Sequence, residues 1–259
     1  MTLNEMIQIG VDQRSFPQYL YKYRADNDFT EKMIIENELW FANPLLFNDP
    51  YDCNTPITSK TTLPEIKNWL QKIGIYFEHI DDLAVKLQTN PNLIQHKTEE
   101  AMSKSGVCCF SSMYDNILQW SHYSDYHKGV CLKFDITEDA DTFITPIIVS
   151  YRKIMQHYNH LVHSERIIEY LIQPKYFEWS YESEIRVVKT EIGLKANGGK
   201  RAFKFKDSAL KEIIFGSKAS DVTIEKYKKL CKDNKKVHVS FSKMEIGQGV
   251  NYELVRTNL

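Results

Sequence analysis

The ten residues from Trp179 to Val188 join an aromatic lead-in to a charged strand pattern, and they constrain the fold more than any other stretch. β-Branched residues beside a charge predict a strand over 185–188. Alternation along that strand would place Glu182, Glu184 and Arg186 on one face. The row has two interpretations: a solvated ion-pair face, or a cleft wall where a carboxylate stabilises positive charge developing on a substrate.

Composition predicts an ordinary globular protein. The chain has 259 residues, of which 42% are hydrophobic and 26% charged. A formal net charge of −1 argues against coating nucleic acid through bulk electrostatics. The amino-terminal residues lack the pattern of a signal peptide, and no apolar run is long enough for a membrane span. We therefore expect a soluble, cytoplasmic protein that does not associate with membranes.

The five cysteines are scattered along the chain and lack C-x-x-C spacing. This distribution favours free thiols over a disulfide framework or a zinc ribbon.

Hydrophobic periodicity predicts an α+β fold with a mixed or antiparallel sheet and a helical insertion. The expected strands are 19–24, 39–42, 106–112, 130–134, 185–188, 203–205, 210–215, 237–241 and 252–255. The expected helices are 31–37 capped by Thr30, a block of three within 62–105, 116–126 and 221–234. Because no Gly/Ser-rich linker flanks 62–105, we interpret this block as an inserted cap or lid within one domain, 1–259.

A rigid loop at 43–52 contains two prolines and an Asn-Asp-Pro turn. Asn48, Asp49 and Asp52 are candidates to face a site, because rigid loops are where scaffolds place functional groups. The alternative is that Asn48 and Asp49 only close the turn through their own backbone.

Hydroxyl and aromatic residues gather around a second segment. Ser111 lies where a buried strand is expected to end, and the following helix carries Trp120, His122 and Tyr123. Each of these can be a core aromatic or a satisfied histidine, but their clustering also fits a binding site.

Histidines recur at His157, His160 and His163 on an expected helix. Steps of three residues drift around a helix of 3.6 residues per turn, and no cysteine or carboxylate stands at ligand spacing. We therefore expect no metal site.

The chain resembles a bacterial domain-of-unknown-function family, number 2971. The resemblance lies in blocks spread in order from residue 20 to 216. They are Leu20-Tyr21-Lys22-Tyr23-Arg24, Leu39-Trp40-Phe41, Phe47-Asn48-Asp49-Pro50, Cys109-Phe110-Ser111, Trp120-Ser121-His122-Tyr123, Gly129-Val130, Trp179-x-Tyr181-Glu182-x-Glu184-x-Arg186 and Ile213-Ile214-Phe215-Gly216.

A more distant resemblance is informative about function. An arginine on an early strand, a strand ending in aromatic-Ser-Ser and a late Glu-x-Glu are similar to the three-part signature of ADP-ribosyltransferases. The resemblance implies a split mixed sheet and NAD as co-substrate. Arg24 would hold a phosphate of NAD, and Ser111 would brace the nicotinamide-side ribose. Glu184 would stabilise the oxocarbenium-like transition state, and Glu182 would orient the acceptor.

The candidate site residues combine this resemblance with the loop and the hydroxyl and aromatic segment described above. The catalytic candidates are Glu184, Glu182, Arg24 and Ser111. The candidates for contacting NAD are Tyr21, Tyr23, Arg24, Ser111, Trp120, His122 and Tyr123. The candidates for other substrate contacts are Asn48, Asp49 and Arg186. We expect Arg24, Ser111 and Glu184 to line one cleft although they lie far apart in the sequence.

The leading hypothesis is transfer of ADP-ribose from NAD to a nucleic acid or a protein, in a toxin-like or phage-defence effector with an antitoxin or defence-system partner. One alternative is a metal-dependent hydrolase or nuclease that uses Asp49, Glu182, Glu184 and His122. The other is a non-catalytic module that recognises a nucleotide or a peptide.

Overall fold

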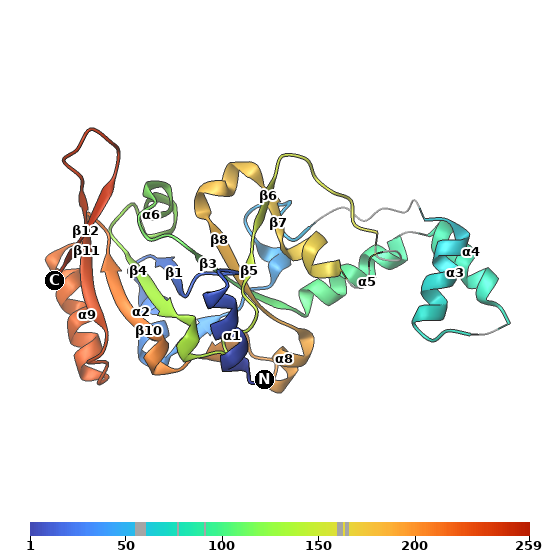
Figure 1. Ribbon diagram of the computed structural model, residues 1–259, viewed down its shortest axis with the longest axis horizontal. Coiled ribbons are helices and arrows are strands. Elements are labelled where there is room, and N and C mark those ends of the chain that lie inside the picture. Colours follow the sequence, from blue (N-terminus) through green and yellow to red (C-terminus); the bar gives the residue numbers. More distant parts are fainter. Residues whose placement is uncertain (55–60, 77, 91, 160–162, 164–165) are drawn as a thin grey trace.

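An eight-stranded sheet runs through the molecule (Figure 1). The structure is a computed structural model, and it describes residues 1–259 except 55–60, 77, 91, 160–162 and 164–165. The strands are β1 (Tyr19–Arg24), β3 (Gly106–Ser111), β4 (Val130–Asp135), β5 (Ile147–Ile148), β8 (Glu184–Lys189), β10 (Leu210–Phe215), β11 (Ser240–Ile246) and β12 (Leu254–Asn258). Their order is β12-β11-β10-β4-β1-β3-β8-β5, and only the β10–β11 pair is parallel. The prediction of an α+β fold with a mixed, mostly antiparallel sheet is confirmed.

Two small ladders and several helical turns complete the strand-rich part. The ladders pair β2 (Glu38–Trp40) with β9 (Ala202–Lys204), and β6 (Ser150–Arg152) with β7 (Pro174–Tyr176). The helical turns are η1 (Pro44–Leu46), η2 (Ile136–Glu138), η4 (Ile168–Ile172), η5 (Phe177–Glu182) and η6 (Asp207–Ala209).

Helices pack on both faces of the sheet. They are α1 (Leu3–Asp12), α2 (Asp28–Glu36), α6 (Ile117–Tyr123), α8 (Glu191–Ala196) and α9 (Asp221–Asp233). On one face, α1, α2 and α9 join the main apolar core, which includes Leu20 and Phe134 of the strands. On the other face, Trp120 of α6 packs with Tyr21 and Tyr23 of β1. Within the described ranges, no helix combines the length and the apolar character that a bilayer span requires.

Several element ends differ from those predicted. Asn27 rather than Thr30 caps α2, because the Asn27 side chain accepts the Thr30 N–H, while the Thr30 hydroxyl donates to the Ala25 carbonyl at 2.8 Å. β11 begins at Ser240 and not at Val237, and β12 begins at Leu254. These shifts occur at the ends of elements, where local capping contacts compete closely.

The sheet parts between β1 and β3. β1 pairs with β4 along all six of its residues, but its ladder with β3 contains the single pair Tyr21 and Ser111. Ser111 is in turn opposite Glu184 on β8, so Tyr21, Ser111 and Glu184 form one row across three strands. Beyond this row β1 and β3 diverge, and Lys22 reaches across to donate to the Cys109 carbonyl at 2.8 Å. This split places the ends of both strands on the wall of a cavity.

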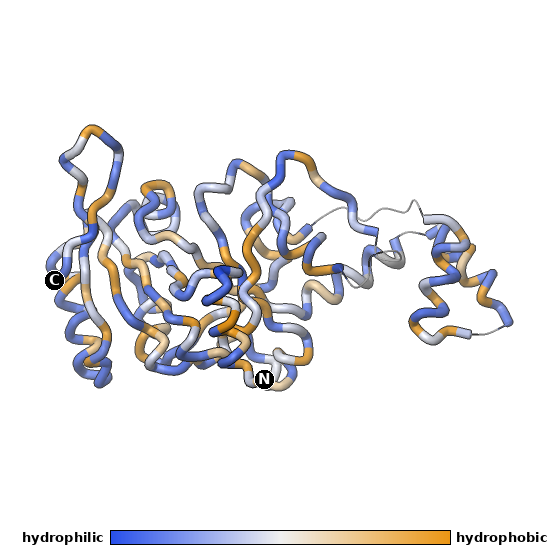
Figure 2. Tube along the Cα trace, in the orientation of Figure 1, coloured by the Kyte–Doolittle hydropathy of each residue, from blue (hydrophilic) through white to orange (hydrophobic). Residues whose placement is uncertain are grey.

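The helical insertion between β2 and β3 consists of α3 (Leu63–Lys72), α4 (Ile80–Thr89) and α5 (Asn92–Ser103), as predicted. α3 and α4 form a hairpin that stands at one end of the long axis, away from the sheet (Figure 1). Ile66, Leu70 and Ala84 give this hairpin an apolar core of its own, and Figure 2 shows hydrophobic residues there as well as along the sheet.

The interpretation of this insertion as a lid stays a prediction. None of its described residues lines the cavity at the β1–β3 split.

The separate core of the α3–α4 hairpin leads to a testable expectation. Leu70→Ala removes a side chain that is buried within the hairpin and should cost about 3 kcal/mol of its local stability. Hydrogen exchange should therefore accelerate in α3 and α4 but not in the sheet. The matched variant Leu132→Ala, in the main core, should instead lower the global unfolding temperature. An equal global loss for both variants would contradict separate cores.

Candidate functional site

A cavity of about 220 Å³ opens at the β1–β3 split. Its lining residues come from β1, β3, α6, η5, β7, β8 and the loop before Asp52. They are Tyr21, Lys22, Tyr23, Arg24, Phe47, Asn48, Asp52, Cys109, Phe110, Ser111, Gln119, Tyr123, Lys175, Glu182 and Glu184. Segments far apart in the sequence thus meet here, and Arg24, Ser111 and Glu184 line one cavity, as expected.

Most of the candidate site residues lie on this cavity. Those that line it are Tyr21, Tyr23, Arg24, Asn48, Ser111, Tyr123, Glu182 and Glu184. Arg186 lies directly behind it, bonded to Glu184. Asp49, Trp120 and His122 do not line it.

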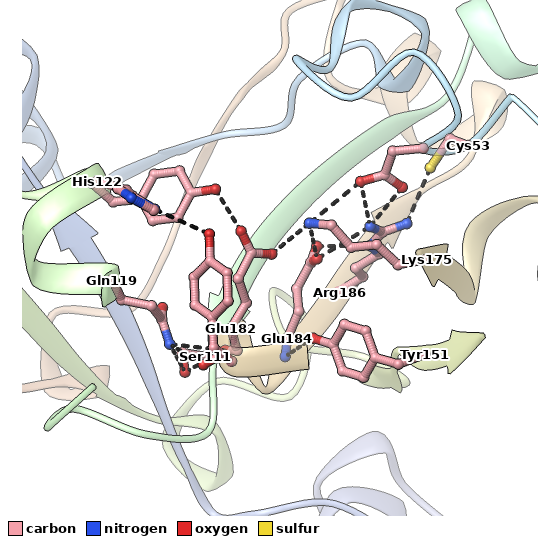
Figure 3. Close-up of polar contacts among 12 residues, drawn as sticks. Cys53, Ser111, Gln119, His122, Tyr151, Lys175, Glu182, Glu184 and Arg186 are labelled. Atoms are coloured by element: carbon pink, nitrogen blue, oxygen red, sulfur yellow. Dashed lines mark hydrogen bonds and ion pairs between the residues drawn. The ribbon is translucent and has the colours of Figure 1, made fainter. Parts of the chain in front are cut away.

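A buried cluster of charges, which we call the acidic cluster, contributes four of its five residues to the cavity lining. Figure 3 shows its polar contacts. The cluster consists of Asp52, Glu182, Glu184, Lys175 and Arg186. Lys175 Nζ is 2.5 Å from Glu182 Oε2, 2.7 Å from Glu184 Oε2 and 3.5 Å from Asp52 Oδ2. Arg186 Nε donates to Glu184 Oε1 at 2.7 Å, and its Nη2 donates to Asp52 Oδ2 at 2.8 Å. Three carboxylates therefore meet two cations, which leaves one negative charge in excess.

The interpretation of the charged row as a solvated face is wrong. The exposed fraction is 6% for Glu182, 4% for Glu184 and 0% for Arg186. The assignment of Glu182 to the strand is also wrong, since this residue ends η5 and the left-handed Ser183 separates it from β8. The turn nevertheless directs Glu182 to the same Lys175 that Glu184 contacts.

Lys175 is held as a cation at the centre of the acidic cluster. Burial alone would lower the pKa of Lys175, but Glu184, Glu182 and Asp52 raise it well above its ordinary value of 10.5. A lysine that stays protonated is not a nucleophile, so the site does not suit imine chemistry at this residue.

The two glutamates differ in protonation. Burial would raise the pKa of Glu184, but Arg186 and Lys175 lower it far below its ordinary value of 4.5. Burial raises the pKa of Glu182 above that value, and Lys175 and Tyr123 offset only part of this effect. The pKa values of the two glutamates are thus shifted in opposite directions, that of Glu184 toward the anion and that of Glu182 toward the protonated acid, and such a split is typical of paired catalytic carboxylates.

Hydrogen bonds hold Glu182 in place. Tyr123 Oη donates to Glu182 Oε1 at 2.5 Å. Ser111 Oγ donates to the Glu182 carbonyl at 2.8 Å and accepts from Gln119 Nε2 at 2.9 Å and from the Met113 N–H at 3.0 Å. The one donor and two acceptor positions of the Ser111 hydroxyl are therefore occupied. Ser111 positions the turn that carries Glu182, and it has no hydrogen-bonding capacity left over for a ribose.

The lining of the cavity also includes two basic residues. Lys22 and Arg24, both half-buried, line the cavity from β1. In the described part of the chain, neither of them has a carboxylate within ion-pairing distance; Arg24 Nε contacts only the Thr30 hydroxyl, at 3.4 Å. Burial lowers the pKa of Arg24, as expected for a guanidinium without a neighbouring anion. Partly buried charges are normally paired, so these two cations indicate an anionic ligand.

Three candidates have structural roles instead. Asp49 Oδ1 accepts the Tyr51 N–H at 2.9 Å and so closes its own turn. Trp120 is fully buried against Tyr23, and its indole N–H donates to the Tyr114 carbonyl. His122 lies outside the cavity, where its Nδ1 is 3.0 Å from Tyr181 Oη. Tertiary packing, which local spacing does not encode, turned Trp120 and His122 away from the site.

Two further expectations concern sulfur and metals. The five cysteines are all free thiols in the structure, as predicted. His160 of the histidine series lies outside the described residues, and within the described ones there is no group of three or more His, Cys, Asp or Glu that could hold a metal ion.

Local sequence patterns do not single out three residues of the site, Asp52, Lys175 and Gln119. Asp52 was considered for the loop, but its salt bridge to Arg186 joins residues 134 positions apart and cannot be read from local patterns. Lys175 stands alone after Pro174 and carries no motif. Gln119 caps no element by its side chain and was not distinguished from other polar helix residues.

Residues 119–187 match a family model described as Protein of unknown function (DUF2971). The matched segment contains the acidic cluster apart from Asp52, together with Gln119 and Tyr123. The basic residues Lys22 and Arg24, on β1, lie outside the matched segment. No curated protein and no solved structure matches the chain.

The central position of Lys175 leads to a stability prediction. Lys175→Met leaves three buried carboxylates with only Arg186 as a partner, so it should lower the free energy of unfolding by about 3–5 kcal/mol. Lys211→Met is the matched control, because Lys211 pairs with the partly exposed Glu138 and should cost under about 1 kcal/mol. Urea unfolding of both variants measures the difference. Equal costs would show that the acidic cluster is not a tightly coupled unit.

The lowered pKa of Glu184 predicts a pH dependence. Because the folded state holds fewer protons on Glu184 than the unfolded chain does, protonation favours unfolding. The stabilisation is complete above pH 4.5 and is lost progressively as the pH falls below it. Urea unfolding between pH 6 and pH 3 should show a smaller decline for Glu184→Gln than for the wild type. Parallel declines would mean that Glu184 has an ordinary pKa in the folded protein.

Proposed function

We propose that this cavity transfers ADP-ribose from NAD to a macromolecular acceptor. The observation that carries the proposal is that Lys22 and Arg24, which have no carboxylate within ion-pairing distance among the described residues, line the same cavity as Glu182 and Glu184 of the acidic cluster. NAD has the complementary charges: a diphosphate, and a cationic nicotinamide ring whose positive charge moves onto the ribose as the bond between them breaks. The row Tyr21–Ser111–Glu184 across β1, β3 and β8 supports the proposal, because it holds these groups on three paired strands.

In the proposed reaction, Arg24 and Lys22 bind the diphosphate and orient the ribose toward Glu184. The bond between the nicotinamide nitrogen and the ribose carbon breaks, and its electron pair leaves with neutral nicotinamide. Glu184 is a fixed anion, so it stabilises the oxocarbenium character of the ribose without reorganising. Arg186 and Tyr151 hold Glu184 in position, the latter by accepting the Glu184 N–H at 2.8 Å.

Glu182 would act on the acceptor. The acceptor nucleophile forms the new bond to the ribose carbon and gives up its proton to Glu182, whose pKa is raised by burial so that it holds a proton more readily than an ordinary glutamate. Tyr123 and Lys175 each bind one oxygen of this carboxylate and so fix its direction.

The geometry gives less support to a metal-dependent nuclease. Of its four proposed residues, Asp49 closes a turn and His122 lies outside the cavity. The other two, Glu182 and Glu184, already share the ammonium of Lys175. A non-catalytic recognition module stays the main alternative, and turnover distinguishes it.

The proposal predicts that purified protein releases nicotinamide from NAD, with water as the acceptor when no macromolecule is present. Glu184→Gln should slow this release about a hundredfold or more, since such an electrostatic contact contributes about 2–4 kcal/mol to the barrier. The same variant loses stability because Glu184 is buried, so circular dichroism must show that it is folded at the assay temperature. Glu138→Gln, at a partly exposed surface pair, is the control and should keep full activity.

Arg24→Gln distinguishes an effect on NAD binding from an effect on the stability of the fold. Arg24 has no acidic partner among the described residues, so its loss should leave the unfolding temperature unchanged or raise it, while the affinity for NAD falls. Calorimetric titration with NAD measures the second effect. A wild-type protein that binds NAD without releasing nicotinamide would support the recognition module, and one that does not bind NAD would overturn the transferase.

A further inference from the structure

A second cavity adjoins the first on the other side of Lys22 and Arg24. Its volume is about 530 Å³, and it lies among β1, β3, α2 and β2. The two cavities share four lining residues, namely Lys22, Arg24, Phe47 and Cys109. The unpaired cations of β1 therefore stand at the boundary between the two cavities and are reached from either side.

The far wall of this second cavity carries two aromatic side chains that the fold leaves uncovered. Phe29 of α2 is 73% exposed and Trp40 of β2 is 59% exposed, although both line the cavity. Neither residue belongs to an apolar core cluster of the described residues. A large aromatic residue at the start of a helix and another on a two-stranded ladder are not required there for folding, so they are available to a ligand.

The charges of the second cavity select the kind of ligand. Its basic residues are Lys22, Arg24 and Lys32, and its one acidic residue, Glu38, is paired with Lys204 at 3.2 Å. Lys32 contacts Glu36 only at 3.8 Å. An anion is thus favoured near β1, and a flat π-system is favoured near Phe29 and Trp40. A heteroaromatic base joined to a phosphate has both properties.

We propose that the second cavity binds a nucleoside 5′-phosphate moiety, with its base on Trp40 and Phe29 and its phosphate on Lys22. The volume suits this ligand, since cavities for small molecules measure about 300–1,000 Å³. The ligand is held by shape, charge and stacking, so its binding requires neither the acidic cluster nor a chemical reaction.

The inference also extends the proposed function and in that respect rests on it. The first cavity, at about 220 Å³, is below the usual range for a ligand as large as a dinucleotide. NAD bound across both cavities would place its adenylate half in the second, its diphosphate at the shared Lys22 and Arg24, and its nicotinamide ribose at Glu184. Binding of AMP alone tests the second cavity without any dependence on transfer.

The experiment is calorimetric titration with AMP, adenosine and inorganic phosphate. Wild-type protein should bind AMP more tightly than either fragment. Trp40→Ala should weaken AMP binding about tenfold, and Trp40→Phe, which keeps an aromatic face, should retain most of it. Lys22→Gln should reduce the AMP affinity to that of adenosine. Tyr252→Ala removes an aromatic residue that is 99% exposed and lies outside both cavities, and it should change nothing.

Equal AMP affinity in the wild type and Trp40→Ala would overturn the inference, as would no AMP binding at millimolar concentration. Binding of a single-stranded oligonucleotide without binding of AMP would also overturn it, in favour of a nucleic-acid surface. AMP binding that depends on Trp40, in a protein that releases no nicotinamide from NAD, would support the second cavity and reject the transferase.

Discussion

The acidic cluster is the interaction on which the site depends. Burying a carboxylate costs several kcal/mol unless a counter-charge and hydrogen bonds compensate for it. Arg186 supplies that compensation from the strand itself, and Lys175 supplies it from β7. Because two cations serve three carboxylates, the compensation is incomplete, and burial raises the pKa of Glu182 although Lys175 and Tyr123 bind it. The pKa values of the two neighbouring glutamates are thus shifted in opposite directions.

The split between β1 and β3 makes the acidic cluster accessible to a ligand. A continuous ladder would pair the facing edges of these strands and close the gap between them. A single residue pair instead lets the strands diverge, and Lys22 and Arg24 line the opening without acidic partners among the described residues. The result is a cavity lined by both carboxylates and cations, next to a second cavity that is lined by Phe29 and Trp40. Such a lining favours a ligand that carries both kinds of charge.

Some parts of the fold are encoded in local sequence patterns and others are not. The strands β1, β3, β4 and β10 and the helices α3 and α9 have strong periodic signals, and they were predicted close to their observed bounds. The cavity was anticipated through Arg24, Ser111 and Glu184. The sequence predicts the environment of each charged side chain less well, because burial depends on what packs above a residue and not on its neighbours in the chain. Arg186 illustrates this, since the same alternation fits a solvated strand and a fully buried one.

By itself, the sequence determined the α+β class, the helical insertion and the strands that carry the charged residues, because hydrophobic periodicity and capping are local properties. Only the tertiary structure decided that Lys175 and Asp52 complete the acidic cluster, and that Trp120 packs in the core. It also decided that the Ser111 hydroxyl donates a hydrogen bond to the backbone of the turn that carries Glu182. These outcomes depend on contacts between residues separated by up to 134 positions, and the energy of a buried charge is set by such contacts rather than by the chain around it.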